Sequence, residues 1–498
     1  MGTEQRFRDC RIAYAAERPG QPFLVNENRT VTAAQAEAVI QKLSTFFRCC
    51  GMRKGTVVAL RITRTIQGAL LFLALQDVEA CTILTDAHRP VREEAEACAQ
   101  SITAEYLISE KEDLQDGACF FENWCMTQKR SERQTEKQVA GSGGIVIFTS
   151  GSTAKSKAVL LGQKQFLENI RGTEALGGYQ EQDRALALLP MNHIFGLALL
   201  FGAVILQHTL FFPEHTDVQY LLHCVETYRL TRMNGIPSVY QAMAEACAGY
   251  DLSTLRYGLI GGAPSTPEQF CAIEKRLGMT LIPVYGMSEC IGISCASWRD
   301  GLEQRSCGVG PFYKENTGKI IKADGTEAAI GEEGEICVKG PAQMTGYLNE
   351  EEAGSGVDAE GFLHTGDLGY LDAQCWLHIS GRKKEIFIRN GYCISFRKIE
   401  EALLQIPEVR EAAVVALDDP KVGEIPAAMV VLYDAESCET LHEKLKKSEK
   451  LTRQELPEWI VSCDFLPKTA SGKTDKQKIR YLLEKGWKDA AKAGGWNG

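Results

Sequence analysis

The sequence predicts an α/β protein, with a large N-terminal domain of parallel-sheet subdomains and a small C-terminal α+β domain. In the first half, helical patterns alternate with short β-branched runs, which is typical of parallel sheets covered by helices. After Gly310 the pattern changes to short strands and Gly-rich turns, which indicates a β-rich subdomain over about residues 310–380. The 498 residues also exceed what one hydrophobic core usually supports, so more than one domain is expected.

The first elements follow from local signals. Thr32 is a typical helix N-cap, and the spacing of apolar residues after it predicts a helix. Short β-branched runs bounded by turn residues predict strands. The expected elements are a helix over 33–47, a strand over 56–62, a helix over 66–76, and strands over 80–85 and 145–148.

One apolar stretch, Ile194 to Phe212, is long enough to be compared with a membrane span. It contains Gln207, His208 and Thr209, and no basic residues flank it. A buried helix followed by a strand accounts for it better, so we expect no membrane span.

The C-terminal domain is predicted to begin after Arg382, which gives domains at 1–382 and 383–498. Beyond this point short strands and helices alternate over roughly 110 residues, a common domain size. The expected elements are strands over 386–389, 409–417 and 427–433, a turn at 390–391, and helices over 397–405, 439–450 and 476–485.

Composition excludes some classes of protein. The net charge of −10 argues against a nucleic-acid partner or an anionic membrane surface. The 18 cysteines include no C-x-x-C pair, so the spacing typical of zinc sites is absent. The opening residues Met-Gly-Thr-Glu-Gln-Arg lack the apolar run of a signal peptide. We therefore expect reduced thiols and a cytoplasmic location.

The most informative segment follows the strand predicted over 145–148. It is a run of hydroxyl residues around one glycine, followed by Lys155 and Lys157. Small side chains let backbone N–H groups approach an anion, hydroxyls add donors, and lysine supplies charge. A P-loop motif is absent, and the alternative is a solvated Ser/Thr/Lys loop. The candidate phosphate-binding residues are Thr149, Ser150, Gly151, Ser152, Thr153 and Lys157.

This segment resembles the phosphate loop of the adenylate-forming superfamily, which includes acyl-CoA synthetases, peptide-synthetase adenylation domains and beetle luciferases. Further segments resemble motifs of the same family and follow in the same order, over nearly the whole chain. They are Pro190-Met191-Asn192-His193, Gly261-Gly262-Ala263-Pro264, Tyr285-Gly286-Met287-Ser288-Glu289, Gly334-Glu335-Ile336, His364-Thr365-Gly366-Asp367, Gly381-Arg382-Lys383-Lys384-Glu385 and Pro467 to Lys473.

The resemblance implies that the protein joins ATP to a small-molecule carboxylic acid, giving acyl-adenylate and pyrophosphate. Glu289 would ligate Mg²⁺, a hard cation that prefers carboxylate and phosphate oxygens. Asp367 would accept hydrogen bonds from the ribose hydroxyls, and Arg382 would contact ribose or phosphate. Without the other motifs, these charged residues would be interpreted as solvated groups or surface ion pairs. The residues expected on the adenine side and beside the magnesium ligand are Gly262, Ala263, Tyr285, Gly286 and Ser288.

Three further roles come from the resemblance alone. Lys473 would stabilise the charge that develops at the α-phosphate, which is typically the largest catalytic contribution. His193 would stand at the mouth of the acyl pocket, although a histidine on an apolar segment is often a core residue. Lys384 would be the hinge about which a mobile C-terminal domain rotates, bringing residues 385–392 to the active site. Gly391 would then line a tunnel for a phosphopantetheine thiol.

Two other functions stay open beside the first, which is transfer of the acyl group to coenzyme A. The protein could instead load a carrier protein, or bind nucleotide as a weakly catalytic paralogue. Ala154, Ser156 and Ala158 favour the last reading, because they depart from the family's Gly-x-Pro-Lys-Gly pattern. Fatty and aryl acids are both compatible with the expected pocket, with fatty acids slightly favoured.

Overall fold

The computed structural model describes residues 6–85, 104–110, 119–121, 124–128, 144–149, 157–348, 356–389, 392–419, 422–433, 438–448, 450–469 and 473–492. Contacts divide the chain into two compact units, each described by itself. The first unit comprises Met1–Gly318 and Val338–Leu363, and the second comprises Lys319–Cys337 and His364–Gly498.

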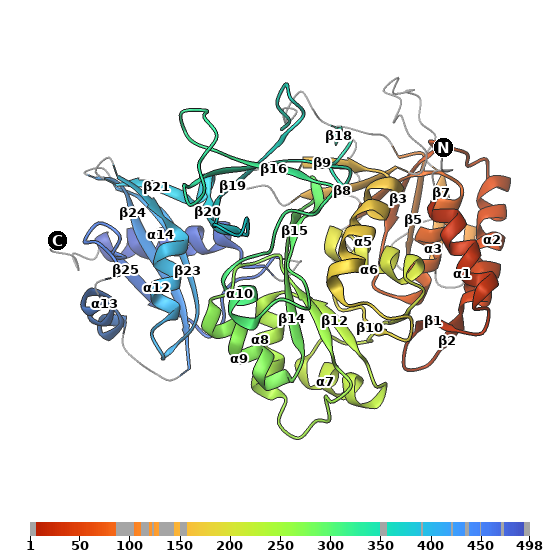
Figure 1. The fold of residues 1–498 in the computed structure, drawn as a ribbon, viewed down its shortest axis with the longest axis horizontal. Coiled ribbons are helices and arrows are strands. Elements are labelled where there is room, and N and C mark those ends of the chain that lie inside the picture. Colours follow the sequence, from red (N-terminus) through yellow and green to blue (C-terminus); the bar gives the residue numbers. More distant parts are fainter. Residues whose placement is uncertain are drawn as a thin grey trace. The chain divides into compact units, whose positions relative to one another are not determined.

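The first sheet of the first unit is mostly parallel, with an antiparallel strand at each edge (Figure 1). Its order is β15-β14-β13-β12-β10-β11-β1-β2. The strands are β1 (Pro22–Val25), β2 (Thr30–Thr32), β10 (Arg184–Leu186), β11 (Thr209–Phe211), β12 (Arg232–Gly235), β13 (Tyr257–Ile260), β14 (Thr280–Met287) and β15 (Cys290–Cys295).

The second sheet of this unit has the order β18-β9-β8-β4-β3-β5-β7-β6. Its centre is parallel, from β5 through β3 and β4 to β8, and the outer strands pair antiparallel. The strands are β3 (Val57–Arg61), β4 (Cys81–Thr85), β5 (Tyr106–Glu110), β6 (Cys119–Phe121), β7 (Trp124–Gln128), β8 (Ile145–Thr149), β9 (Lys157–Leu161) and β18 (Gly346–Tyr347).

Helices of the first unit meet around Phe201. Its ring stacks on Phe166 at a centroid distance of 4.2 Å and lies 4.3 Å from the ring of Phe7. Aromatic rings at such distances add to the stabilisation from burial. The helices are α1 (Phe7–Glu17), α2 (Ala33–Cys49), α3 (Ile66–Asp77), α5 (Gln163–Gly177), α6 (Ile194–Ile205), α7 (Val218–Thr227), α8 (Pro237–Ala246), α9 (Pro267–Leu277) and α10 (Leu302–Cys307).

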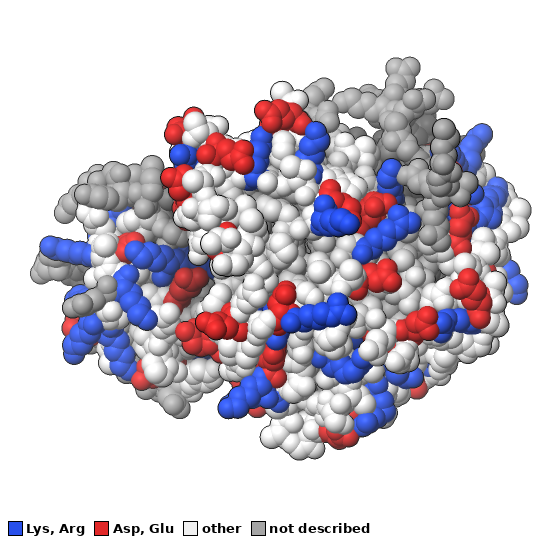
Figure 2. Space-filling view, viewed as in Figure 1, with Lys and Arg blue, Asp and Glu red and all other residues white. Residues whose placement is uncertain are grey.

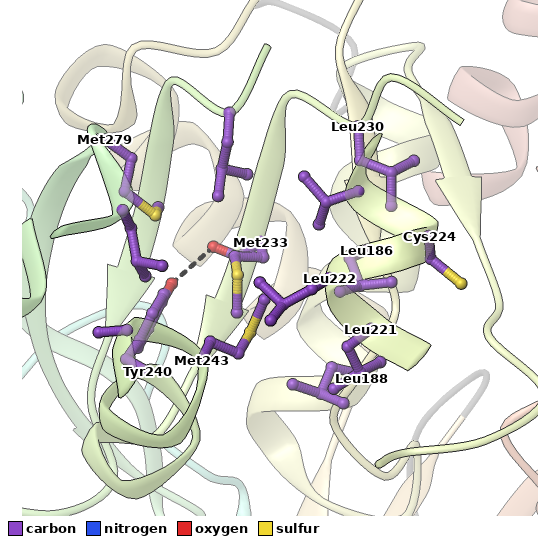
Figure 3. Packing of buried hydrophobic residues seen from close by; sticks show 14 of the residues in the cluster. Leu186, Leu188, Leu221, Leu222, Cys224, Leu230, Met233, Tyr240, Met243 and Met279 are labelled. Carbon is purple, nitrogen blue, oxygen red and sulfur yellow. Dashed lines mark hydrogen bonds between the residues drawn. The ribbon is translucent and has the colours of Figure 1, made fainter. Parts of the chain in front are cut away.

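A second core lies where α7, α8 and α9 pack with strands of the first sheet. Figure 3 shows Tyr240 near three methionines of this cluster, with its leucines on the other side of the view, and the Tyr240 hydroxyl donates to the Met233 carbonyl at 2.9 Å. Tyr240 is fully buried, so this hydrogen bond satisfies a polar group that would otherwise be costly. The cluster fixes β12 and β13, the strands that lead toward the candidate site.

The apolar stretch from residue 194 forms the helix α6 and then the strand β11, as the sequence predicts. Helix α6 is only 12 residues long, and most of its side chains are buried. Among the described residues, no helix is long and apolar enough to cross a membrane.

In the second unit, the first sheet has the order β16-β17-β19-β20, and the second has β22-β21-β24-β23, with β25 beside β24. The strands are β16 (Thr317–Ile321), β17 (Gly334–Lys339), β19 (Leu363–Leu371), β20 (Leu377–Arg382), β21 (Ile386–Arg389), β22 (Tyr392–Ser395), β23 (Val409–Asp419), β24 (Gly423–Leu432) and β25 (Trp459–Ser462). The helices are α12 (Phe396–Leu404), α13 (Cys438–Lys447) and α14 (Lys476–Lys492).

The strand β23 is buried on both faces. Val414 and Ala416 belong to a core that includes residues of α12 and α13, whereas Val415 and Leu417 belong to a core that includes α14. Successive strand residues point to opposite faces, so one strand serves both cores. This explains why the segment is continuously apolar instead of alternating.

The predicted α/β fold class is confirmed, with several corrected bounds. The strand expected over 427–433 begins at Gly423, because the long hairpin with β23 extends its pairing to Asp419. The helix expected over 476–485 continues to Lys492. Strand β25 was not predicted. The expected turn at 390–391 lies outside the described residues.

The compact units do not coincide with the predicted domains. The units assign most of the β-rich segment to the same body as the C-terminal residues, whereas the sequence places a boundary between residues 382 and 383. The predicted boundary separates two domains that are expected to rotate relative to each other between the two half-reactions, and it stays a prediction. On the face drawn in Figure 2, acidic and basic side chains of described residues are interspersed, as on an ordinary solvated surface.

Candidate functional site

The adenine-side motif lies directly beyond a parallel strand of the first unit. Gly261 follows the end of β13, and Gly262 and Ala263 are exposed there. A Cβ on Gly261 would lie 2.6 Å from the Val284 carbonyl oxygen, and Gly262 has φ +80°. Both positions therefore require glycine. The carboxyl ends of parallel strands are where ligands bind in open α/β sheets.

The next strand, β14, carries the second motif at its end. Tyr285 is 8% exposed, and Gly286 packs so closely that a Cβ would lie 2.2 Å from the Ile291 carbonyl oxygen. Ser288, which is partly buried, and Glu289 form the tight turn between β14 and β15. The motif glycine thus permits a hairpin that brings Glu289 back beside the sheet.

Glu289 is joined by a residue that the sequence analysis did not identify. The Tyr347 hydroxyl donates to Glu289 Oε1 at 2.8 Å, and both residues are buried. Lys157 Nζ lies 4.4 Å from the centroid of the Tyr347 ring. Burial and the carboxylate raise the pKa of Tyr347, so it stays a hydrogen-bond donor. The structure thus brings together the predicted magnesium ligand and the predicted phosphate-binding lysine.

The phosphate loop itself is only partly described. Thr149 ends β8 and pairs with Lys157 across the β8–β9 hairpin, which places the connecting loop after a buried strand. The predicted residues Ser150, Gly151, Ser152 and Thr153 lie outside the described residues, as do Ala154 and Ser156.

His193 is the N-cap residue of α6 and is partly buried. Its backbone amide donates to the Pro190 carbonyl at 3.2 Å, and its own carbonyl accepts from Leu197 at 2.9 Å. A Cβ at Gly196 would lie 2.1 Å from the Pro190 carbonyl oxygen, so the turn before the helix depends on that glycine. The ring is therefore carried by a fixed backbone turn rather than by a flexible loop.

In the second unit, Asp367 and Arg382 are opposite each other on the antiparallel strands β19 and β20. Arg382 Nε lies 2.7 Å from Asp367 Oδ1, and the side chain of Asp367 is 5% exposed while that of Arg382 is 60% exposed. The sequence analysis identified each residue but did not pair them. The arginine holds the buried carboxylate in place and itself faces solvent.

Lys473 follows a loop that closes on itself. The Thr469 amide donates to the Lys473 carbonyl at 2.7 Å, and the Asp475 amide donates to the Pro467 carbonyl at 2.8 Å. The pKa of Lys473 is lowered by displacement of water around the ammonium and by the like charge of Arg382, while Asp367 opposes this. Lys473 is exposed, and its charged neighbours Arg382 and Asp367 belong to the same compact unit.

The predicted hinge lies in a short 3₁₀ helix, Lys383–Glu385, and ion pairs flank it. Lys383 Nζ lies 2.8 Å from Glu335 Oε2, and Lys476 Nζ lies 3.0 Å from Glu385 Oε2. Burial lowers the pKa of Lys476, but Glu400 and Glu385 outweigh it and raise that pKa. The side chain of Lys384 lies outside the described residues.

Comparison with known proteins identifies two matching domain families. Residues 13–348 match the model of the AMP-binding enzymes, and residues 398–473 match that of the AMP-binding enzyme C-terminal domain. A 2-succinylbenzoate–CoA ligase of Bacillus cereus is 28% identical over 471 residues, which is 94% of this chain and 96% of the relative. An indoleacetate–CoA ligase of Aromatoleum aromaticum is 30% identical over 347 residues, covering 68% of this chain and 67% of the relative.

A solved structure agrees with these matches. The o-succinylbenzoate CoA synthetase of Bacillus subtilis, in complex with the acyl-adenylate intermediate, is 26% identical with a TM-score of 0.80. The alignment covers 97% of this chain and 98% of that structure. The first family model alone spans well over half of the chain, so the resemblance found in the motifs is confirmed: the protein belongs to the AMP-binding enzymes.

Proposed function

We propose that this protein is an AMP-forming acid–CoA ligase, which adenylates a carboxylic acid with ATP and then transfers the acyl group to the thiol of coenzyme A. The observation that carries the proposal is the surroundings of Lys473. Its charge environment includes Asp367 and Arg382, within one compact unit. We infer that Lys473, whose charge interacts with that of the proposed ribose ligand Asp367, acts on the α-phosphate when nucleotide is bound.

The proposed nucleotide contacts follow from the chemistry of each residue. Asp367 offers carboxylate oxygen to the ribose hydroxyls, with Arg382 holding that carboxylate. Thr149 to Thr153 and Lys157 bind the β- and γ-phosphates through hydroxyls, backbone amides and charge. The exposed turn at Gly262 and Ala263, with Tyr285, Gly286 and Ser288, borders the adenine.

Magnesium fits the surroundings of Glu289. This carboxylate is 7% exposed and is oriented by a neutral tyrosine hydroxyl, which leaves its negative charge in place. Mg²⁺ is usually held by one or two carboxylates together with phosphate oxygens. When bound there, the ion would neutralise phosphate charge, and Tyr347 would fix the orientation of its ligand.

Adenylation requires positioning and charge stabilisation more than covalent chemistry by the protein. A carboxylate oxygen of the substrate attacks the α-phosphorus, the bond to the bridging oxygen breaks, and pyrophosphate leaves. Lys473 stabilises the charge that builds up on the phosphoryl oxygens. His193 borders the acid at the pocket mouth and takes no proton.

The second half-reaction is proposed to follow a rotation about Lys384. The two ion pairs beside it, Lys383–Glu335 and Lys476–Glu385, each include a partly exposed partner. The exposed Lys383 ammonium can exchange Glu335 for water when the hinge turns, whereas the Lys476–Glu385 pair lies within the predicted C-terminal domain and moves with it. The thiol of coenzyme A then attacks the acyl carbon, and AMP leaves.

An aryl acid is the more strongly supported substrate class. The named activities of two relatives, on 2-succinylbenzoate and on indoleacetate, concern acids that carry a ring. This reverses the slight preference for fatty acids that the sequence alone suggests. Coenzyme A is preferred over a carrier protein for the same reason. The thirteen cysteines whose side chains the structure describes form no disulfide, which agrees with a reducing compartment such as the cytoplasm.

The test is pyrophosphate release from ATP and Mg²⁺ against a panel of aryl and fatty acids, with and without coenzyme A. We expect release that depends on an aryl acid and is stimulated by coenzyme A. Pyrophosphate release that is unchanged by coenzyme A but stimulated by a phosphopantetheinylated carrier protein would show that the protein is a carrier-loading ligase. Measurable ATP binding without release from any acid would establish the weakly catalytic paralogue.

A further inference from the structure

Three chemically different side chains meet on the neighbouring strands β17 and β19. Glu335 and Cys337 are two residues apart on β17, so they share one face of the strand, and His364 lies on β19. His364 Nδ1 lies 2.9 Å from Glu335 Oε2 and 3.4 Å from Cys337 Sγ. One ligand atom of each residue lies within 4.8 Å of the others.

We propose that Glu335, Cys337 and His364 form a binding site for a thiophilic divalent cation such as Zn²⁺. Carboxylate, thiolate and imidazole are the three ligand types that zinc takes from proteins, and three protein ligands leave a fourth position open. No local spacing predicts the site, because β17 and β19 are far apart in the sequence. The site would hold a metal other than the magnesium proposed at Glu289.

The geometry is close to what zinc requires. Bond lengths of about 2.3 Å to sulfur and about 2.05 Å to nitrogen, at tetrahedral angles, put the two ligand atoms about 3.5 Å apart. The structure has 3.4 Å between Cys337 Sγ and His364 Nδ1. The nitrogen-to-carboxylate separation of 2.9 Å is that of a hydrogen bond and has to widen by about 0.5 Å.

The chemistry of the ligands also permits binding. Glu335 Oε2 faces the Lys383 ammonium at 2.8 Å and His364 Nδ1 at 2.9 Å, so this oxygen already accepts a positively charged neighbour. His364 can bind through Nδ1 with its remaining proton on Nε2. The thiol of Cys337 loses its proton to solvent when the cation binds, so affinity rises with pH.

Lys383 is the competitor for this site. Its ammonium lies 2.8 Å from Glu335 Oε2, the oxygen that also faces His364, whereas Glu335 Oε1 accepts from the Gly366 amide at 3.1 Å. The Lys383 side chain is 54% exposed and can therefore turn into solvent. His364 is exposed, which gives a cation access to the buried thiol.

Binding of a cation at the proposed site would change the ion pairs beside the predicted hinge. A bound cation displaces Lys383, which immediately precedes Lys384, and thereby removes one of the two ion pairs beside that residue. This consequence rests on the proposed function, whereas binding of the cation does not. Binding is therefore tested without ATP, acid or coenzyme A.

The experiment is a Co²⁺ titration of the purified full chain, reduced with a thiol-free reductant and followed by absorbance. We expect one Co²⁺ per chain, a thiolate-to-cobalt charge-transfer band, and loss of both when Zn²⁺ is added. The variant Cys337→Ser should lose the band. The matched control is Cys375→Ser, which removes an exposed thiol of the same unit and should keep it.

Two more variants distinguish loss of the metal-binding site from loss of folding. His364→Gln should weaken binding by roughly tenfold or more, since even the loss of a group that only orients a ligand costs about 10–100-fold, with an unchanged thermal midpoint in the absence of metal. Lys383→Ala should strengthen binding severalfold, because the competing charge is gone. The proposal is overturned if the wild type shows no charge-transfer band, or if the band survives Cys337→Ser. Equal loss of the band in Cys375→Ser would likewise overturn it.

Discussion

The two compact units hold their candidate functional residues in different ways. In the first unit, Glu289 and the glycines before it lie at the ends of buried parallel strands, where an added Cβ would meet backbone atoms. In the second unit, Asp367, Lys383 and Glu385 are held by ion pairs whose basic partners are wholly or partly exposed. The first arrangement cannot change without breaking the sheet, whereas the second can change at small cost.

The difference suggests a division of labour. A rigid strand end keeps a ligand in one place through a whole reaction, and exposed ion pairs permit two alternative arrangements of nearly equal energy. We therefore expect substitutions in the first unit to impair both half-reactions. Substitutions in the second unit should affect one half-reaction more than the other.

The largest effect is expected from Lys473→Ala. Removing an oriented charge stabiliser should lower the rate of acyl-adenylate formation by roughly 10²-fold or more. Thioester formation from a supplied acyl-adenylate should be spared, because the α-phosphate bond is then already made. Single-turnover assays of the two half-reactions measure this separately.

The control is Lys478→Ala, which removes an exposed lysine from the start of α14, the helix that follows the Lys473 loop. It should leave both half-reactions near the wild-type rate. An equal loss of the two half-reactions in Lys473→Ala would refute the model of two alternative arrangements.

The second effect is expected from Lys384→Pro. Proline fixes φ at position 384, so it should prevent the change of backbone angle that a hinge needs. Thioester formation should fall by roughly tenfold or more, and adenylation should change little. The control is Lys384→Ala, which keeps backbone freedom, and normal thioester turnover in the proline variant would exclude this residue as the hinge.

Local signals predicted individual elements well. Thr32 caps α2 as expected, with its hydroxyl accepting from the Gln35 amide, and the helix begins at Ala33. The order of motifs predicted the family and therefore the fold class. These features depend on residues that are close in sequence, and a single chain displays them directly.

Pairing over long sequence distances could not be predicted in this way. The Glu289–Tyr347 hydrogen bond joins residues 58 positions apart, and nothing beside Tyr347 marks it as different from a core aromatic. The Cys337–His364 contact spans 27 positions and likewise has no local signal. The sequence supplied candidate residues such as Asp367 and Arg382, whereas their pairing depends on strand register, which is set by the whole sheet.

A smaller effect is expected in the first unit from Tyr347→Phe. The change leaves Glu289 Oε1 without its buried donor, and hydrogen bonds to charged groups contribute about 1.5–3 kcal/mol. We expect the Mg²⁺ and ATP concentrations needed for half-maximal adenylation to rise by roughly tenfold. Tyr313→Phe is the matched control, because its hydroxyl lies 3.0 Å from that of Thr173 in the core. Similar shifts in both variants would assign the effect to general loss of packing.

The smallest effect is expected from Lys476→Gln. This variant tests most directly whether residues of the second unit affect one half-reaction more than the other. Lys476 lies 3.0 Å from both Glu385 Oε2 and Glu400 Oε1, and it begins the helix that follows the Lys473 loop. It therefore ties that loop to the residue after the hinge.

Since such ion pairs contribute about 1 kcal/mol or less, adenylation should fall only a few-fold. Thioester formation should stay constant, because Lys476 supports the start of the helix that follows the Lys473 loop, and Lys473 is proposed to act only in adenylation. The ratio of the two single-turnover rates measures this, with Lys478→Gln as control. An equal fall in both rates would mean that Lys476 supports the fold of the second unit as a whole and has no specific effect on the Lys473 loop.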